Sequence, residues 1–347
     1  MDESEFVFEL RTCRWAERRW PPDGGDRAVL VARQLGTKRR RWDTVVIEVD
    51  ADAFARRADF GRRRLDGDML GVVRHAPAEW EWYRDALPDP DYPWRYVRET
   101  IHEADERGIL KVRKRGNRLE IKRRYEYPDW IRRIVAIENK PDLDASAARD
   151  LRPQLERDVA LSLADEVWVA TNATGETVEP ALLESVPVEA GILTFDGHDA
   201  AVAWYPRTLD VDAPGTRILE RPSGGKYDQS AARFEYVPPE EKAKKRIEIA
   251  ERAYERGWRT YTRTMRPDCR HFELRREEAL VLPYCDAKSC HQTARECSGR
   301  CSAFEPEPPA WRQKGWPIEG GPGNASKRLL ESRRERYRPG QWASDAE

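Results

Sequence analysis

One short apolar run, Ile134–Ile137, continues directly into Glu138, Asn139 and Lys140. A strand this short commonly ends in turn residues, whereas here an acid and a base follow two positions apart. Side chains alternate along a strand, so Glu138 and Lys140 are predicted to project from the same face. The chain is therefore constrained to a fold in which a strand end presents an acid and a base together.

The segments around this strand predict an α/β core. Residues 3–20 have an apolar stripe with helical spacing, and residues 28–50 contain two β-rich runs joined by the turn sequence GTKRRR. A helical pattern over residues 146–164 follows the strand at 133–140, and EVWVATN at 166–172 reads as the next strand. The predicted order is helix, hairpin, strand, helix, strand.

A different segment interrupts this order between the hairpin and the strand. Residues 92–108 read as a helix, and residues 109–124 read as two short strands around a basic tip, which resembles the end of a winged helix. The predicted segments are a first core part at 1–50, a winged-helix-like insertion at 51–131, a second core part at 132–222, a helical and cysteine-rich metal-binding region at 223–305 and a mobile tail at 306–347.

Asp43 lies at the start of the second strand of the hairpin and is expected to meet Glu138 and Lys140 on the neighbouring strand. Two carboxylates at one strand edge suit Mg²⁺ or Mn²⁺, which prefer oxygen ligands. A lysine beside the ion can orient water or stabilise charge on a phosphate. Glu48 is a rival carboxylate, but its position has the opposite parity to Asp43.

An Asp followed by Glu-x-Lys over this order of elements resembles the PD-(D/E)xK nuclease superfamily. The resemblance implies a restriction-endonuclease-like core in which Asp43 and Glu138 hold the metal ion and Lys140 assists. RecB-like members carry a Gln on the following helix, which corresponds to Gln154 here and would orient substrate or the lysine. Asp158 stands where many members have Tyr. Some members also use a Glu of the first helix, for which Glu9 is preferred over Glu17.

Longer segments, including YPWRYVRETIHEADERG, IVAIENKPDLDASAARDL and ADEVWVATNATGE, are similar to a family of uncharacterised proteins from halophilic archaea. That resemblance spans nearly the whole chain. It implies a RecB-like nuclease-type core and brings no established activity.

The two strands at 109–124 contain eight basic residues and one acid, Glu120. Such a ribbon is expected to contact a nucleic-acid backbone more than base edges. The alternative is a solvated ribbon paired with acids elsewhere. The residues predicted to bind nucleic acid are Lys111, Arg113, Lys114, Arg115, Arg118 and Lys122.

Five of the six cysteines lie between residues 269 and 301, which predicts a structural metal site in a chain expected to be cytoplasmic. The preferred site is local and takes four thiolates to Zn²⁺, with an iron–sulfur cluster that includes Cys13 as the second possibility. Free or packing cysteines are the remaining alternative. The preferred ligands are Cys269, Cys285, Cys297 and Cys301, because Cys269 and Cys301 share a Cys-x2-Phe spacing.

Acidic and basic residues nearly balance, at 63 and 62, so overall charge gives no argument for a nucleic-acid partner and only local patches can. No apolar run reaches the length of a membrane span, and the N-terminus lacks a signal-peptide pattern. The sequence favours Mg²⁺-dependent hydrolysis of DNA phosphodiesters. A non-catalytic DNA-binding regulator on the same scaffold and an RNA-processing enzyme remain alternatives, as does a chance occurrence of the motif.

Overall fold

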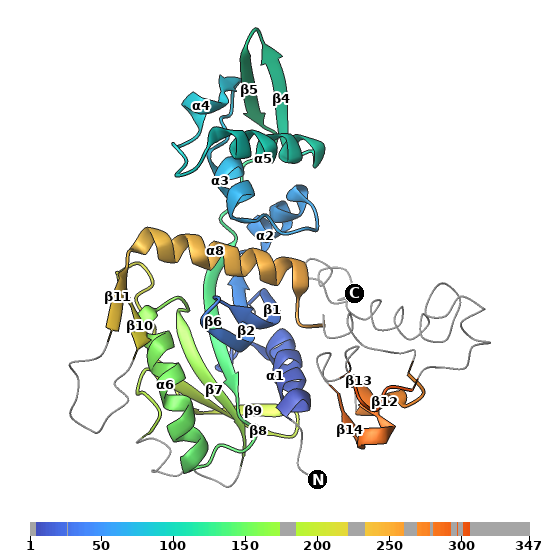
Figure 1. Cartoon of the computed structure of the whole chain (residues 1–347). Coiled ribbons are helices and arrows are strands. Elements are labelled where there is room, and N and C mark those ends of the chain that lie inside the picture. Colours follow the sequence, from blue (N-terminus) through green and yellow to red (C-terminus); the bar gives the residue numbers. More distant parts are fainter. Residues whose placement is uncertain are drawn as a thin grey trace.

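The computed structural model describes residues 5–25, 27–173, 185–220, 233–259, 269–277, 280–292, 297 and 301–305. Its centre is one mixed β-sheet with helices on both faces, and a smaller lobe projects from one end of it (Figure 1). The fold is therefore mixed α/β, as the sequence predicts.

The central sheet has the strand order β1-β2-β6-β7-β8-β9. Pairs β1/β2, β2/β6 and β8/β9 are antiparallel, whereas β6/β7 and β7/β8 are parallel. The elements of the core are α1 (Glu5–Arg19), β1 (Val29–Gly36), β2 (Arg41–Val49), β6 (Ile131–Asn139), α6 (Ala145–Leu161), β7 (Glu166–Asn172), β8 (Ala190–Asp196), β9 (Asp199–Trp204) and α8 (Pro239–Arg256).

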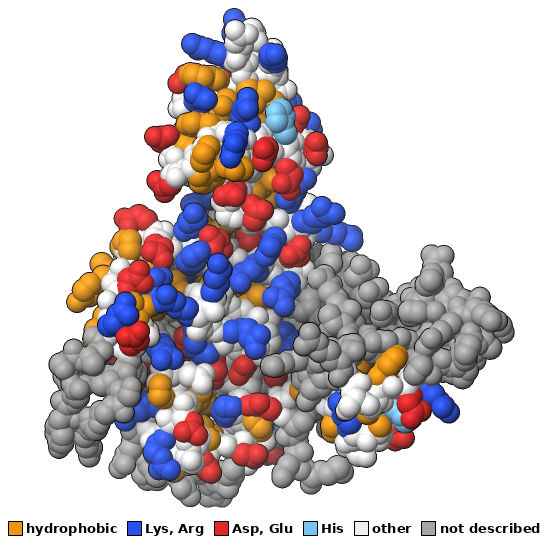
Figure 2. Space-filling model, in the orientation of Figure 1, with side chains coloured by type: hydrophobic (Ala, Val, Ile, Leu, Met, Phe, Trp, Pro, Cys, Tyr) orange, Lys and Arg blue, Asp and Glu red, His pale blue; other side chains and the backbone are white. Residues whose placement is uncertain are grey.

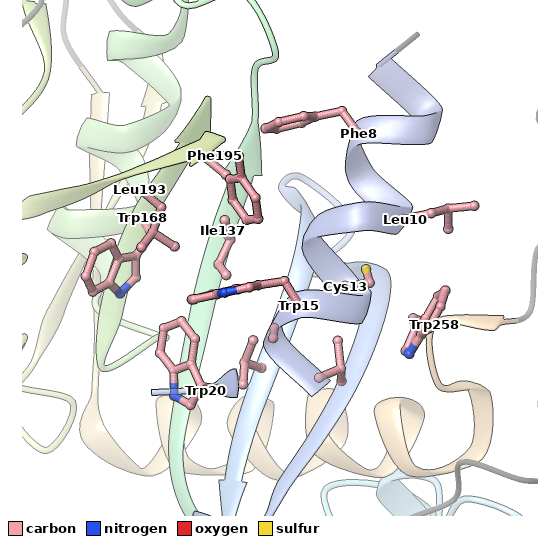
Figure 3. Close-up of a cluster of buried hydrophobic side chains, with 14 of the residues drawn as sticks. Phe8, Leu10, Cys13, Trp15, Trp20, Ile137, Trp168, Leu193, Phe195 and Trp258 are labelled. Atoms are coloured by element: carbon pink, nitrogen blue, oxygen red, sulfur yellow. The ribbon is translucent and has the colours of Figure 1, made fainter. Parts of the chain in front are cut away.

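Helix α1 covers one face of the sheet. Its aromatic residues Phe8 and Trp15 pack beside Phe195 of β8, and Trp20 meets Trp168 of β7 edge to face (Figure 3). Bulky aromatic groups of this kind account for much of the apolar area that a helix buries against a sheet. This cluster fixes the position of α1 over the strands that carry Asp43 and Glu138.

Helices α6 and α8 cover the opposite face. Ile249, Ala250 and Ala253 of α8 pack on the strands β1, β2 and β6, while Leu151 and Leu155 of α6 pack on β7 and β8. The alternation along β2 and β6 supplies both layers, because successive side chains point to opposite faces. The core is thus three layers, with the sheet in the middle.

The projecting lobe contains the segment between β2 and β6 and has its own hydrophobic core. It has a three-stranded sheet of order β3-β5-β4. Its elements, together with the segment that leads into it, are α2 (Ala51–Arg57), η1 (Ala58–Phe60), α3 (Gly67–His75), β3 (Glu81–Trp82), α4 (Tyr83–Ala86), α5 (Trp94–Glu106), β4 (Leu110–Arg115) and β5 (Arg118–Arg123).

Two further strand groups lie outside the main sheet. The hairpin of β10 (Gly215–Glu220) and β11 (Arg233–Val237), which was not expected from the sequence, lies beside α6. Gly215 is required there, because a Cβ would meet the backbone of Leu161 at 2.3 Å. The cysteine-rich region forms a small sheet of β12 (Phe272–Glu277), β13 (Leu280–Cys285) and β14 (Cys290–His291), with η3 (Asp286–Lys288) before β14.

The tail predicted to be mobile, 306–347, lies outside the described residues. Within the described part of the chain, no helix has the length and apolar character needed to cross a membrane.

Candidate functional site

Gln34 of β1, Asp43 of β2 and Glu138 of β6 form a row of neighbouring residues, which we call the acidic row. The register pairs Thr44 with Ile137, and continuing it by one residue sets Asp43 opposite Glu138. Gln34 of β1 lies next to Asp43 on the other side, with its side-chain Nε2 3.2 Å from Asp43 Oδ1. Directly opposed residues of an antiparallel pair share a face. The structure therefore brings the two predicted carboxylates to neighbouring positions.

Asp43 is held from both sides. Its Oδ2 accepts a hydrogen bond from the backbone N–H of Asn139 at 3.0 Å, and its Oδ1 accepts one from Gln34. Burial nevertheless raises the pKa of Asp43, and its hydrogen bonds only partly oppose this effect. The main-chain bond to Asn139 fixes the aspartate at the end of the strand that carries Glu138.

Glu138 is 4% exposed, and burial raises its pKa to about 8, with the charge of Asp43 as the second cause. Its Oε1 lies 2.6 Å from Arg40 Nη2. The charge and hydrogen bond of Arg40 lower the pKa of Glu138, but they do not outweigh its burial and the charge of Asp43. Glu138 is therefore a buried carboxylate whose charge Arg40 only partly neutralises.

Arg40 links Glu138 to α6. Its Nη2 lies 2.8 Å from Asp158 Oδ2, and its Nε donates to both Asp158 oxygens. The turn that positions Arg40 depends on Gly36, which has φ 155° and whose missing Cβ would lie 2.3 Å from the Arg40 carbonyl oxygen. Burial raises the pKa of Asp158, although Arg40 opposes the effect.

Glu9 of α1 joins the site through Gln34, whose Nε2 also donates to Glu9 Oε1 at 2.9 Å. Arg33 binds the same carboxylate through two nitrogens, at 3.0 and 2.6 Å. Burial is the main cause of the raised pKa of Glu9, and the charge of Asp43 adds to it. Gln34 adopts a positive φ of 55°, which lets one amide group reach both acids.

Lys140 follows β6 and forms an ion pair with Glu5 of α1. Desolvation lowers the pKa of Lys140, but the bond to Glu5 outweighs it and the pKa is raised, with smaller contributions from Asp43 and Glu138. Gln154 is half-buried on α6, one turn before Asp158. Lys140 is thus near the acidic row, although its own ion pair is with α1.

Sequence reasoning missed Gln34 and Arg40. Gln34 stands within a strand, and Arg40 belongs to a basic turn that reads as solvated surface. The rival Glu48 lies elsewhere, because Trp20 Nε1 donates to it at 2.9 Å and Arg27 binds both of its oxygens. No sequence pattern distinguishes Arg40 from its neighbours, since its contacts depend on where α6 packs.

The acidic row offers oxygen ligands of the kind that Mg²⁺ takes. Within the described ranges, no three His, Cys, Asp or Glu side chains already stand together as a metal-ligand set. Mg²⁺ is commonly bound by one or two carboxylates with water and substrate phosphate as the other ligands. Asp43 and Glu138, which lie opposite each other on adjacent strands, fit that requirement.

The basic ribbon is partly neutralised within the lobe. Glu120 lies 2.6 Å from Arg113 and 3.9 Å from Arg115, and Lys122 lies 3.0 Å from Glu79. Arg118 lies over the ring of Trp82. Lys111 and Lys114 have no acidic partner within the described part of the chain. The ribbon therefore keeps lysines that a polyanion can contact.

Four cysteines line one small cavity of about 20 Å³. Cys269 and Cys301 each begin a turn closed by a hydrogen bond from the backbone N–H of the phenylalanine three residues later, at 3.1 and 3.2 Å. Cys290 is exposed and does not line this cavity. The lining cysteines are Cys269, Cys285, Cys297 and Cys301.

Cys13 of α1 does not line this cavity and is buried in the cluster of Figure 3, where its Sγ is 3.3 Å from Thr44 Oγ1. Burial raises the pKa of this thiol. Cys13 thus packs within the core, and Phe272, which lines the cysteine cavity, packs against the same cluster.

The fold and the site define a mixed α/β protein with a buried acidic row at the end of its central strands. Residues 30–306 match a family of unknown function, DUF5787, and the chain belongs to this family. No curated protein and no solved structure matches the chain.

Proposed function

We propose that the protein is a PD-(D/E)xK-type nuclease that hydrolyses DNA phosphodiesters with Mg²⁺. The observation that carries this proposal is the pairing of Asp43 with Glu138 on adjacent strands, followed by Lys140. The helix, hairpin, strand, helix, strand order of α1, β1, β2, β6, α6 and β7 supports it.

In this proposal Asp43 and Glu138 hold the ion, and Glu9 supports Asp43 through Gln34. The bound ion would polarise the phosphodiester and lower the pKa of an attacking water. Lys140 would leave Glu5 and orient that water or contact the phosphate, and Gln154 would orient substrate.

The raised pKa values of the carboxylates agree with a cation site. Burial raises the pKa of Glu9, Asp43 and Glu138 because no charge in the protein fully offsets their desolvation. A divalent cation would offset it, and its binding would displace the proton that Glu138 holds at neutral pH. Mg²⁺ affinity is therefore expected to rise with pH up to about 8.

The inserted lobe supports a nucleic-acid partner. Its order α3, β3, α4, α5, β4, β5 and its sheet order β3-β5-β4 agree with a winged helix. The exposed face of α5 carries Glu99 and Glu103, which disfavours close approach to phosphates. We therefore assign backbone contacts to the ribbon, through Lys111 and Lys114.

The test is cleavage of duplex and single-stranded DNA with and without Mg²⁺. Asp43→Asn, Glu138→Gln and Lys140→Ala are each expected to reduce cleavage at least 100-fold while DNA binding is kept. Glu48→Gln is the matched control, because it removes a buried carboxylate of the same strand outside the row. Equal loss in the control, or full activity of Glu138→Gln, contradicts the proposal.

A non-catalytic DNA-binding regulator is the second candidate. The position of Arg40 favours it, since its guanidinium already lies between Glu138 and Asp158, where a cation would be needed. Wild-type protein that binds DNA but shows no cleavage with Mg²⁺ or Mn²⁺ supports this role. An RNA substrate would be identified by the same assay on RNA.

We also propose that the cysteine cavity holds one structural Zn²⁺. Its volume of about 20 Å³ is close to that of a single small occupant, and four thiolates are a common zinc ligand set. Because the four side chains do not already stand as a ligand set among the described residues, they would have to move to bring the sulfurs to about 2.3 Å from the ion. Among the side chains that the structure describes, the small sheet of β12 to β14 has few buried ones, which is typical of segments that a metal stabilises.

Elemental analysis of purified protein is expected to give one zinc per chain. Cys285→Ser should lose the zinc, whereas Cys290→Ser, which alters a cysteine outside the cavity, should keep it. Iron together with visible absorbance would indicate an iron–sulfur cluster in place of zinc. Protein without either metal contradicts the site.

A further inference from the structure

Two adjoining cavities extend from the inserted lobe to Arg40 and Asp158, the pair beside Glu138. The larger, about 490 Å³, extends from Gly36 in the β1–β2 turn to Gly67 at the start of α3. The smaller, about 290 Å³, is lined by Arg40 and Asp158, which contact Glu138 directly or through each other. The cavities share several lining residues, including Arg39, and so form one continuous groove.

The groove is strongly basic. Acids are few, and in the larger cavity they are Asp66 and Glu248. In the view of Figure 2, Lys and Arg side chains gather where the lobe meets α8 and the core. The cationic residues that line the larger cavity are Lys38, Arg39, Arg64, Arg217, Lys245 and Arg252.

These cations differ in how far they are neutralised. Arg217 contacts Glu235 and Glu241, and Lys245 contacts Glu248. Lys38 and Arg39 are exposed and have no acidic partner in the described part of the chain.

Arg252 is a further sign of crowded positive charge. Desolvation lowers its pKa, the charge of Glu248 opposes this, and the nearby charges of Arg256 and Arg64 lower it further. A bound polyanion would relieve this repulsion.

We propose that this groove holds the sugar–phosphate backbone of the substrate strand between the acidic row and the inserted lobe. The inference rests on the proposed nuclease function and names the path of its substrate. Lysine and arginine contacts to phosphate position a nucleic acid without reading its sequence. The groove leads at one end to Arg40 beside Glu138 and at the other to the lobe whose ribbon carries Lys111 and Lys114.

The experiment measures DNA binding by fluorescence anisotropy in EDTA, so that no cleavage occurs. The triple variant Lys38→Gln, Arg39→Gln, Arg64→Gln removes three exposed charges of the groove. We expect affinity to fall at least 10-fold. The slope of log affinity against log salt should become shallower by about 2 to 3, at roughly 0.7–0.9 per phosphate contact.

The matched control removes three charges that line neither cavity, with the substitutions Arg19→Gln, Arg132→Gln and Arg207→Gln. It should bind DNA within twofold of the wild type, and circular dichroism should show both triple variants folded. If the groove variant loses no more DNA affinity than the control variant, the proposal is overturned. Polyglutamate that competes as well as DNA at equal charge also overturns it.

The readout separates the two proposals. If the wild type binds DNA through these residues but never cleaves it, the groove proposal stands and the nuclease proposal is contradicted. If the wild type cleaves DNA and the groove variant binds DNA with unchanged affinity, only the groove proposal is contradicted. Tighter binding of RNA through the same residues supports the groove and changes the substrate.

Discussion

Two buried ion pairs in this protein differ in how completely they are satisfied. Arg57 and Glu251, which link the segment before the lobe to α8, are both fully buried, and Arg57 Nε donates to Glu251 Oε1 at 2.6 Å. Glu251 also accepts from the backbone of Leu65 at 2.7 Å and from Tyr127 at 2.8 Å. Every part of this pair has a partner of good geometry.

The pair of Glu138 and Arg40 is different. Glu138 shares Arg40 with Asp158 and lies beside Asp43, whose charge raises the pKa of Glu138 further. A buried charge pair gains from its surroundings only when its remaining donors and acceptors are bonded. The first pair therefore serves the fold, whereas in the second one guanidinium serves two buried carboxylates with raised pKa values, as is common at functional sites.

Removing Glu251 should have the largest effect. Glu251→Leu leaves Arg57 buried without its carboxylate, and the free energy of unfolding is expected to fall by about 3–5 kcal/mol. Urea unfolding measures this. Glu248→Gln, which alters a partly exposed pair with Lys245 on the same helix, is the control and should change stability by less than about 1 kcal/mol. If Glu251→Leu lowers the free energy of unfolding by less than about 1 kcal/mol, the two buried ion pairs do not differ as described.

The acidic row should make stability depend on pH. The pKa of Glu138 is raised from 4.5 to about 8 on folding, so the folded state holds a proton that the unfolded state releases between these values. Metal-free protein is therefore expected to lose stability as pH rises from about 5 to 8, by at most ~1.4 kcal/mol per unit for this group.

Glu138→Gln should flatten that slope, because the amide imitates the protonated acid. Urea unfolding at pH 5.5 and 8.5 compares the two proteins. Glu9, Asp43 and Asp158 shift in the same direction, so part of the slope should remain. An unchanged slope in the variant would place the titration elsewhere.

Arg40→Gln tests whether the pair of Glu138 and Arg40 lies at a metal site. Loss of the guanidinium leaves Glu138 and Asp158 without their cation, and stability at pH 8 is expected to fall by about 2 kcal/mol. Mg²⁺ at 100 times its dissociation constant should restore about 2.7 kcal/mol. Thermal unfolding with and without Mg²⁺ measures both effects. If Mg²⁺ does not stabilise the variant, the pair of Glu138 and Arg40 is structural, like the pair of Arg57 and Glu251.

The smallest effect is expected at the ribbon. Lys111 is exposed and has no acidic partner in the described part of the chain, so Lys111→Gln should change stability by less than about 0.5 kcal/mol. DNA binding should lose about one unit of salt dependence if the ribbon contacts the backbone. Anisotropy titrations at several salt concentrations test this, with Arg132→Gln as the control.

The local sequence determined the elements of the core. The alternation in residues 41–49 and 131–139 and the apolar stripe of α1 predict the strands and helix that the structure contains, because these periods decide which side chains can be buried. The same alternation placed Asp43 and Glu138 at positions of a shared face, and the Cys-x2-Phe spacing grouped Cys269 with Cys301.

Tertiary structure decided the rest. Gln34 reaches Glu9 only because α1 packs over β1, and Arg40 meets Asp158 only because α6 lies beside the β1–β2 turn. The β10–β11 hairpin and the basic groove likewise depend on segments distant in sequence. Local patterns report which residues are buried, whereas the partners of a buried charge are fixed by long-range packing.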